Sequence, residues 1–202
     1  MNPRKLMAVA LCAAACVTTT AFAADDFGIE SASPVVIADP VNPQPGMVFN
    51  AYKKGSMPKD IMQESNSSLP KEAALKTGVD KGEKFSCDIA QGTEANVMRW
   101  EGFIKCKRKA IYTFVFQKSS QGLYGVNGYS VRINGQAAIP AGWDDSTCDV
   151  ELKAGWNKVE IVCHFRSDNP LVASYKPKGS LSDPRPIAPK DLFYDQKPEP
   201  EW

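Results

Sequence analysis

Two adjacent acids and an aromatic ring stand together in the stretch "IPAGWDDST", where Trp143 precedes Asp144 and Asp145. Paired carboxylates are ligands that Ca²⁺ prefers, so the stretch is a candidate metal site. Aspartates in loops also accept backbone N–H bonds and form turns. The pattern favours a turn with Trp143 half-buried beside it, and calcium bound by Asp144 and Asp145 is the alternative.

Residues for nucleophilic or metal-assisted catalysis do not form a recognisable set. The single histidine, His164, follows Cys163, so the two side chains point to opposite faces of a strand. No C-x-x-C, H-E-x-x-H, phosphate-binding loop or dinucleotide-binding glycine pattern occurs. We therefore predict a protein that is not an enzyme and holds no cofactor. A small glycan hydrolase using Asp144 and Asp145 is the remaining enzymatic alternative.

The N-terminus has the features of a secretory leader. Arg4 and Lys5 precede the apolar run "LMAVALCAAACV", and Ala21-Phe22-Ala23 fits a small-x-small cleavage site. We predict a signal peptide over residues 1–23, cleaved after Ala23, and a mature chain without a transmembrane segment. The mature protein is expected in the periplasm, or secreted to the cell surface.

Lipidation at Cys16 is the alternative processing event. The pattern "AAAC" places Ala13 where a lipoprotein signal has a large aliphatic residue. The sequence therefore favours cleavage after Ala23.

The near-zero net charge argues against a partner bound mainly by long-range electrostatic attraction. The chain carries 24 Lys and Arg against 23 Asp and Glu. A nucleic-acid partner is therefore not expected. The cluster "KCKRK", Lys105 to Lys109, is a local exception that we interpret as an exposed turn rather than a binding patch.

Alternating apolar residues predict a series of short strands. Turn signals separate them, and Asn134-Gly135 is the strongest hairpin signal. This pattern predicts an all-β antiparallel β-sandwich with a proline-rich N-terminal arm and little helix beyond one short turn at Pro70 to Gly78. The predicted strands lie within residues 46–55, 84–90, 95–107, 110–118, 128–140 and 148–165.

Four cysteines remain outside the leader, and an even number in an exported chain indicates disulfides. In the predicted strands all four share the apolar face, where sulfur atoms can meet. Three pairings are possible, and we favour Cys106–Cys163 together with Cys87–Cys148.

Several segments in order resemble one family. They are "PGMVFNAYKKGSMPKDI", "VMRWEGFIKCKRKAIYTFVFQ", "YSVRINGQAAIPAGW", "VELKAGWNKVEIVCHF" and "RPIAPKDLFYD". Together they resemble the protective-antigen-type domain, also called the PA-fourteen domain, over residues 46–195. The resemblance implies a β-sandwich found in toxins, glycosidases and adhesins.

The resemblance also implies where a ligand would bind. Carbohydrate-binding members hold calcium with two adjacent aspartates just after the Tyr-Thr-Phe strand, whereas this chain has Lys118, Ser119 and Ser120 there. An ammonium and two hydroxyls are poor calcium ligands, which puts the calcium-lectin role in doubt. The glycine- and tyrosine-rich loop that follows remains a candidate contact surface. The ligand-binding candidates are Lys118, Ser119, Ser120, Tyr124, Asn127, Tyr129 and Trp143.

These observations predict four segments: a signal peptide (1–23), an extended arm (24–45), a PA-fourteen-like sandwich (46–195) and a tail (196–202). The expected function is non-catalytic recognition of a glycan or cell-surface component, in the manner of an adhesin. The alternative is a structural or assembly subunit of an envelope complex that binds no small ligand.

Overall fold

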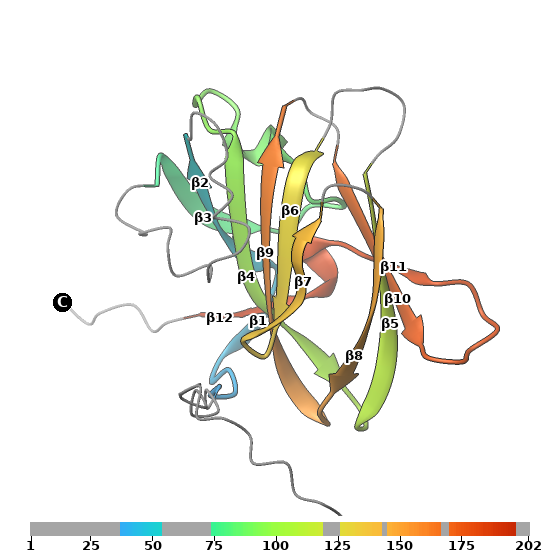
Figure 1. The fold of residues 1–202 in the computed structure, drawn as a ribbon. Coiled ribbons are helices and arrows are strands. Elements are labelled where there is room, and N and C mark those ends of the chain that lie inside the picture. The colour runs from blue at the N-terminus through green and yellow to red at the C-terminus, as the bar shows by residue number, and fades with distance from the viewer. Residues whose placement is uncertain (1–36, 54–73, 119–125, 143–144, 167–169, 197–202) are drawn as a thin grey trace, which may run out of the picture. The chain divides into compact units, whose positions relative to one another are not determined.

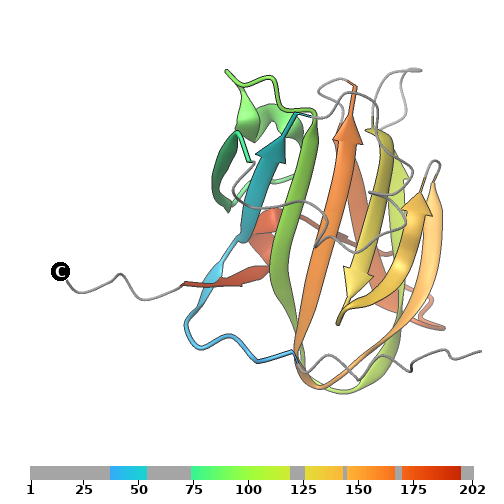
Figure 2. The ribbon, with the colours of Figure 1, turned by 60° about the vertical axis from the view of Figure 1, so that its left-hand side comes forward.

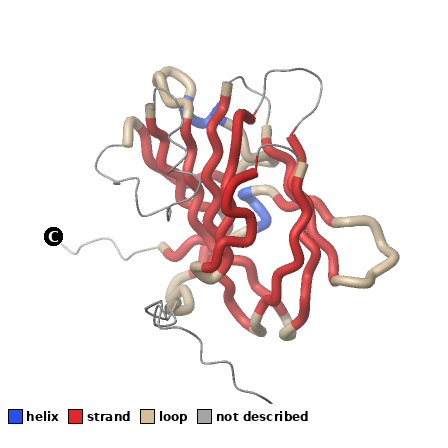
Figure 3. Tube along the Cα trace, in the orientation of Figure 1, coloured by secondary structure: helices blue, strands red, loops and turns tan. Residues whose placement is uncertain are grey.

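The computed structural model describes residues 37–53, 74–118, 126–142, 145–166 and 170–196. Contacts divide the chain into Met1–Ser33 and Pro34–Trp202, and every described residue lies in the second unit. Within these residues the structure contains strands β1 to β12 and two short 3-10 helices, η3 (Cys87–Ala90) and η4 (Pro189–Asp191) (Figure 3). The predicted all-β antiparallel fold is therefore confirmed.

The larger sheet is built around two long strands, β4 and β9. Its order is β1-β12-β4-β9-β6-β7, and β2 pairs with β4 on one side and β3 on the other. The strands are β1 (Pro43–Pro45), β2 (Met47–Tyr52), β3 (Lys76–Asp80), β4 (Val97–Cys106), β6 (Val126–Ile133), β7 (Gln136–Gly142), β9 (Gly155–Phe165) and β12 (Phe193–Asp195).

The smaller sheet faces it and has the order β11-β10-β5-β8. Figures 1 and 2 show the two sheets as opposed layers, with β7 and β8 at one side of the sandwich. Rings from the two layers meet in the interior, as where Phe116 lies 5.9 Å from Tyr129. The strands are β5 (Ala110–Lys118), β8 (Ser146–Leu152), β10 (Leu171–Pro177) and β11 (Arg185–Ile187).

The core centres on Trp100 of β4, which is fully buried. Phe85 and Phe165 contact its ring edge-on, with ring centroids at 5.4 and 6.1 Å. The indole Nε1 donates a hydrogen bond of 2.8 Å to the buried Asp80 carboxylate, which also accepts from the Gly82 amide. One side chain therefore joins the apolar core to the end of β3, and its polar atom has a partner.

The predicted turn at Asn134-Gly135 is confirmed. Both residues have positive φ, 52° and 79°, as a two-residue hairpin turn requires. The Asn134 side chain accepts a hydrogen bond from the Lys158 amide at 3.0 Å. The turn therefore also fixes β9 beside the β6–β7 hairpin.

Three local predictions were wrong, two because pairing with a distant strand outweighs local pattern and one because of a local cap. Pro43–Pro45, placed in the extended arm, is an edge strand that pairs with β12. Cys87–Ala90, predicted as strand, is the 3-10 helix η3, with Ser86 as its N-cap. Lys76 to Gly78, placed in a helical turn, belong to β3 and pair with β2.

The four cysteines are thiols in this structure. Cys106 pairs with Gly155 in the β4–β9 register, while Cys163 lies opposite Met98. Met98 and Cys106 are eight residues apart on β4, so the two cysteines are separated along the strands by about 26 Å, far more than a disulfide allows. A Cys106–Cys163 disulfide therefore does not fit this fold, and Cys87–Cys148 stays a prediction.

Replacing Trp100 with Phe should lower the free energy of unfolding by about 2 kcal/mol or more. The substitution leaves the buried Asp80 carboxylate without its indole donor and opens space in the core. Urea denaturation measures the change. Trp156→Phe is the control, because Trp156 is partly exposed, and an equal loss in the two variants contradicts the role given to Trp100.

Peptide mapping without reduction should find no peptide that links Cys106 to Cys163. The two thiols lie at opposite ends of neighbouring strands. Recovery of that linked peptide from folded protein would disprove the β4–β9 register.

Candidate functional site

Most of the predicted ligand loop lies outside the described residues. Ser119, Ser120 and Tyr124 fall there, as do Trp143 and Asp144. These five candidates therefore stay predictions.

The backbone of two further candidates is described. Lys118 ends β5, where it pairs with Leu171, and Asn127 lies at a register shift of β6 between Val126 and Gly128.

Tyr129 is in the core rather than at the surface. Its side chain is fully buried, contacts Phe116 and is hydrogen-bonded to Ser146. Burial raises the pKa of its phenol above the ordinary value. A ligand on the surface cannot contact this residue, so its assignment as a ligand-binding residue was wrong.

Asp145 is exposed at the entrance to β8. Within the described ranges no group of three or more His, Cys, Asp or Glu side chains is placed to hold a metal ion. Asp145 alone supplies too few oxygens for Ca²⁺, which takes six to eight. The predicted calcium pair is incomplete in the described chain, because Asp144 lies outside it.

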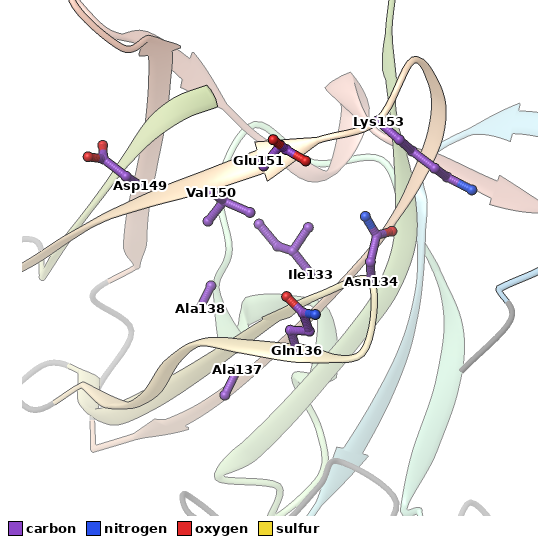
Figure 4. A pocket seen from close by; sticks show the side chains of 9 residues that line it. All are labelled: Ile133, Asn134, Gln136, Ala137, Ala138, Asp149, Val150, Glu151 and Lys153. Atoms are coloured by element: carbon purple, nitrogen blue, oxygen red, sulfur yellow. The ribbon is translucent and has the colours of Figure 1, made fainter. Parts of the chain in front are cut away.

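One pocket, of about 350 Å³, lies between the β6–β7 hairpin and β8, and we call it the edge pocket. Figure 4 shows Val150 pointing toward Ile133 and Ala138, while Asp149 and Glu151 on either side of it point away. The alternation of β8 therefore gives the pocket an apolar interior.

The two carboxylates beside the edge pocket already have partners. Asp149 binds Lys178 at 2.7 Å and Thr113 at 2.6 Å, and Glu151 binds Lys109 at 2.8 Å. The Lys178 and Thr113 hydrogen bonds hold the pKa of Asp149 below its usual value. These ion pairs connect β8 to the neighbouring segments of the fold.

Asn157 connects the two turns beside the edge pocket and has no exposed surface. Its Oδ1 accepts from the Lys153 amide at 2.9 Å and from Asn134 Nδ2 at 2.8 Å, while its Nδ2 donates to the Lys153 carbonyl at 2.9 Å. The role of this amide is therefore structural.

A second pocket, of about 580 Å³, lies where β4 ends and the chain turns into β5, beside the connection from β10 to β11. We call it the basic pocket. Tyr112 and Tyr175 contribute rings from the smaller sheet, and the Cys106 thiol comes from the larger sheet. The pocket therefore opens between the ends of the two layers, at the end of β5 opposite Lys118.

Positive side chains dominate the basic pocket. Its lining includes one carboxylate, Asp183, against five cations: Lys105, Lys107, Arg108, Lys176 and Arg185. The Lys105 ammonium lies 4.8 Å from the centre of the Trp156 ring, a cation–π contact. The Lys176 ammonium donates to the Ser182 carbonyl at 3.5 Å, which attaches the β10–β11 connection to β10.

The tyrosine rings form a half-buried wall of the basic pocket. Their centroids are 5.9 Å apart, and Phe114 stacks on Tyr175 at 5.8 Å. Burial raises the pKa of the Tyr175 phenol, and the positive charge of Arg185 acts in the opposite direction. Burial likewise raises the pKa of the Cys106 thiol, so this cysteine is not a thiolate nucleophile at neutral pH.

The sequence contained one signal for this pocket. Lys105, Lys107 and Arg108 belong to the cluster interpreted above as an exposed turn. Its last three residues form the β4–β5 turn, while Lys105 belongs to β4. The sequence did not show which residues lie beside this cluster. Tyr175, Lys176 and Arg185 come next to it only through the pairing of β10 with β5 and β11.

Within the described residues, no helix is long and apolar enough to cross a membrane.

No protein family model matches the chain, and no curated protein matches its sequence. Solved structures do match. The PA14 domain of the MpAFP antifreeze protein aligns with a TM-score of 0.52 and 14% identity over 81% of this chain and 98% of that domain. The PA14 sugar-binding domain from an RTX adhesin aligns with a TM-score of 0.52 and 12% identity, over 75% of this chain and 99% of that domain.

An anti-sigma factor domain-containing protein also matches, with a TM-score of 0.52 and 15% identity over 78% of this chain. This chain covers 50% of that structure, about half its length. At these identities the comparisons show the fold alone, and the fold is a PA14-like β-sandwich, as the sequence predicts.

Replacing Asn157 with Ala should lower the free energy of unfolding by about 1–3 kcal/mol, because the Lys153 backbone groups and the Asn134 amide lose the partner that the buried Asn157 side chain provides. Chemical denaturation measures the loss. The matched control is Asn42→Ala at an exposed position, where a change within about 0.5 kcal/mol is expected. A loss at Asn157 no larger than at Asn42 contradicts the structural role.

Proposed function

We propose that this protein is an exported, non-catalytic recognition module that binds a glycan or another cell-surface component. The observation that carries the proposal is the basic pocket, an open site of about 580 Å³ with two half-buried tyrosine rings. Sites for small ligands have volumes of about 300–1,000 Å³ and combine aromatic surface with a few polar groups.

The side chains of the basic pocket suit binding better than catalysis. Tyrosine presents an apolar face and a hydroxyl, which together can contact the C–H face and the hydroxyls of a sugar ring. The Cys106 thiol stays protonated at neutral pH. One carboxylate, Asp183, lines the pocket, whereas glycoside cleavage uses a pair.

The fold supports the same function without establishing it. The RTX adhesin domain of similar fold is described as sugar-binding. Function depends on a site rather than on a fold, so the likeness adds weight only because this chain has its own open pocket. Export rests on the leader predicted over residues 1–23, and the proposed location is the periplasm or the cell surface.

A second candidate function is assembly into an envelope complex. Strands β7 and β8 each end their sheet in the described part of the chain. An edge strand can pair with a strand from another protein, and the edge pocket lies between these two edges.

A glycan array probed with the purified protein tests the proposal, once with calcium and once with a chelator. We expect saturable binding to a defined set of saccharides. The binding should not depend on calcium, because the basic pocket offers mainly cations rather than metal-binding carboxylates.

A blank array contradicts glycan recognition. If a blank array is accompanied by a stoichiometric partner recovered from envelope extracts, the assembly function is favoured. Binding abolished by the chelator places the site elsewhere in the chain, away from the basic pocket.

A further inference from the structure

The cations of the β4–β5 turn and of β10 to β11 divide into two groups. Lys109 and Lys178 point to β8, where they pair with Glu151 and Asp149 at 2.8 and 2.7 Å. Neither lysine lines the basic pocket. Their charges are therefore neutralised within the fold.

The second group lines the basic pocket and lacks such partners. Lys107, Arg108 and Arg185 are exposed, and none of them forms an ion pair with another described residue. Three exposed cations without an ion pair to another described residue therefore line one pocket of a near-neutral chain. Such a concentration raises the local density of anions and favours an anionic ligand.

The side chains of the basic pocket also indicate which kind of anionic group a ligand would carry. Arg185 pairs with Tyr175 across β10 and β11, which places a guanidinium beside a ring of the tyrosine wall. Arg108 lines the pocket from the turn between β4 and β5. A guanidinium binds carboxylate, sulfate or phosphate oxygens through two parallel N–H bonds.

The β10–β11 connection that closes one side of the pocket has its own internal bonds. The Ser180 amide donates to the Pro177 carbonyl at 3.0 Å, and Gly179 supplies the positive φ of 78° within this turn. The Ser180 and Ser182 hydroxyls bond each other at 2.7 Å. Ordered loops lose less entropy on binding, which suits this segment to ligand contact.

We propose that the basic pocket binds an acidic saccharide, that is, a sugar bearing a carboxylate, sulfate or phosphate group. Arg108 and Arg185 hold the anionic group, with Lys107 adding positive potential. Tyr112 and Tyr175 contact the sugar ring. This inference rests on the proposed glycan recognition and gives the ligand its charge.

The saccharide is favoured over a nucleic acid by the extent of the charge. A nucleic-acid site follows a long backbone and needs a basic stripe. Here the unpaired cations surround one pocket, and the Lys109 and Lys178 charges beyond it are neutralised by β8. An acidic sugar of limited size fits that distribution.

Calorimetry with a uronic-acid oligosaccharide, and with the same oligosaccharide after reduction of its carboxyl groups, tests the inference. We expect the acidic form to bind at least tenfold more tightly. Raising the salt from 50 to 500 mM should weaken that binding several-fold, because ions screen exposed charges. A sulfated oligosaccharide, inorganic phosphate and a single-stranded oligonucleotide serve as further probes.

Two double variants identify the site. Arg108→Gln with Arg185→Gln should weaken binding of the acidic oligosaccharide at least tenfold. Lys109→Gln with Lys178→Gln removes the same charge from the same two regions outside the pocket, and should change binding by less than twofold. Urea denaturation of both variants controls for folding.

The outcomes separate this inference from the function it rests on. Equal binding of the acidic and reduced oligosaccharides, or equal losses in the two double variants, overturns the acidic-sugar site and leaves glycan recognition intact. Binding of phosphate alone, or equal binding of the oligonucleotide, also overturns it. Failure of every saccharide on the array overturns the glycan recognition on which the inference rests.

Discussion

The pairing of β4 with β9 is the constraint on which the rest of the structure depends. The two strands pair along all ten residues of β4, from Val97 opposite His164 to Cys106 opposite Gly155. This register places Trp100 beside Ile161 at the centre of the buried layer, where the indole contacts two phenylalanine rings and a buried carboxylate. Every other strand of the larger sheet is added beside this pair, and the smaller sheet covers its inner face.

The same register positions the sites. Because β4 ends at Cys106, its basic turn lies at the end of the sandwich, where β10 also ends at Pro177. The basic pocket lies at these ends and is lined by residues of both sheets. The edge pocket arises differently, between the outermost strands β7 and β8, and its neighbouring turns are held by the buried amide of Asn157.

Neutralisation by β8 explains how a chain of balanced composition presents a basic site. Asp149 and Glu151 lie on the outward face of β8 and bind two lysines from neighbouring segments. The pocket side of the same segments has Asp183 against five cations. A total charge near zero therefore gives no information on the local potential, which depends on which side chains face one another.

The sequence by itself determined the all-β class, the inward and outward faces of the long strands and the hairpin at Asn134-Gly135. Those features follow from a period of two and from the backbone that a tight turn requires, both of which are local. The tertiary structure alone decided that Cys106 and Cys163 lie far apart, that Tyr129 is core, and that Arg108 and Arg185 line one pocket. The reason is that strand register and sheet pairing join residues distant in the chain, and no local pattern specifies which partner each strand takes.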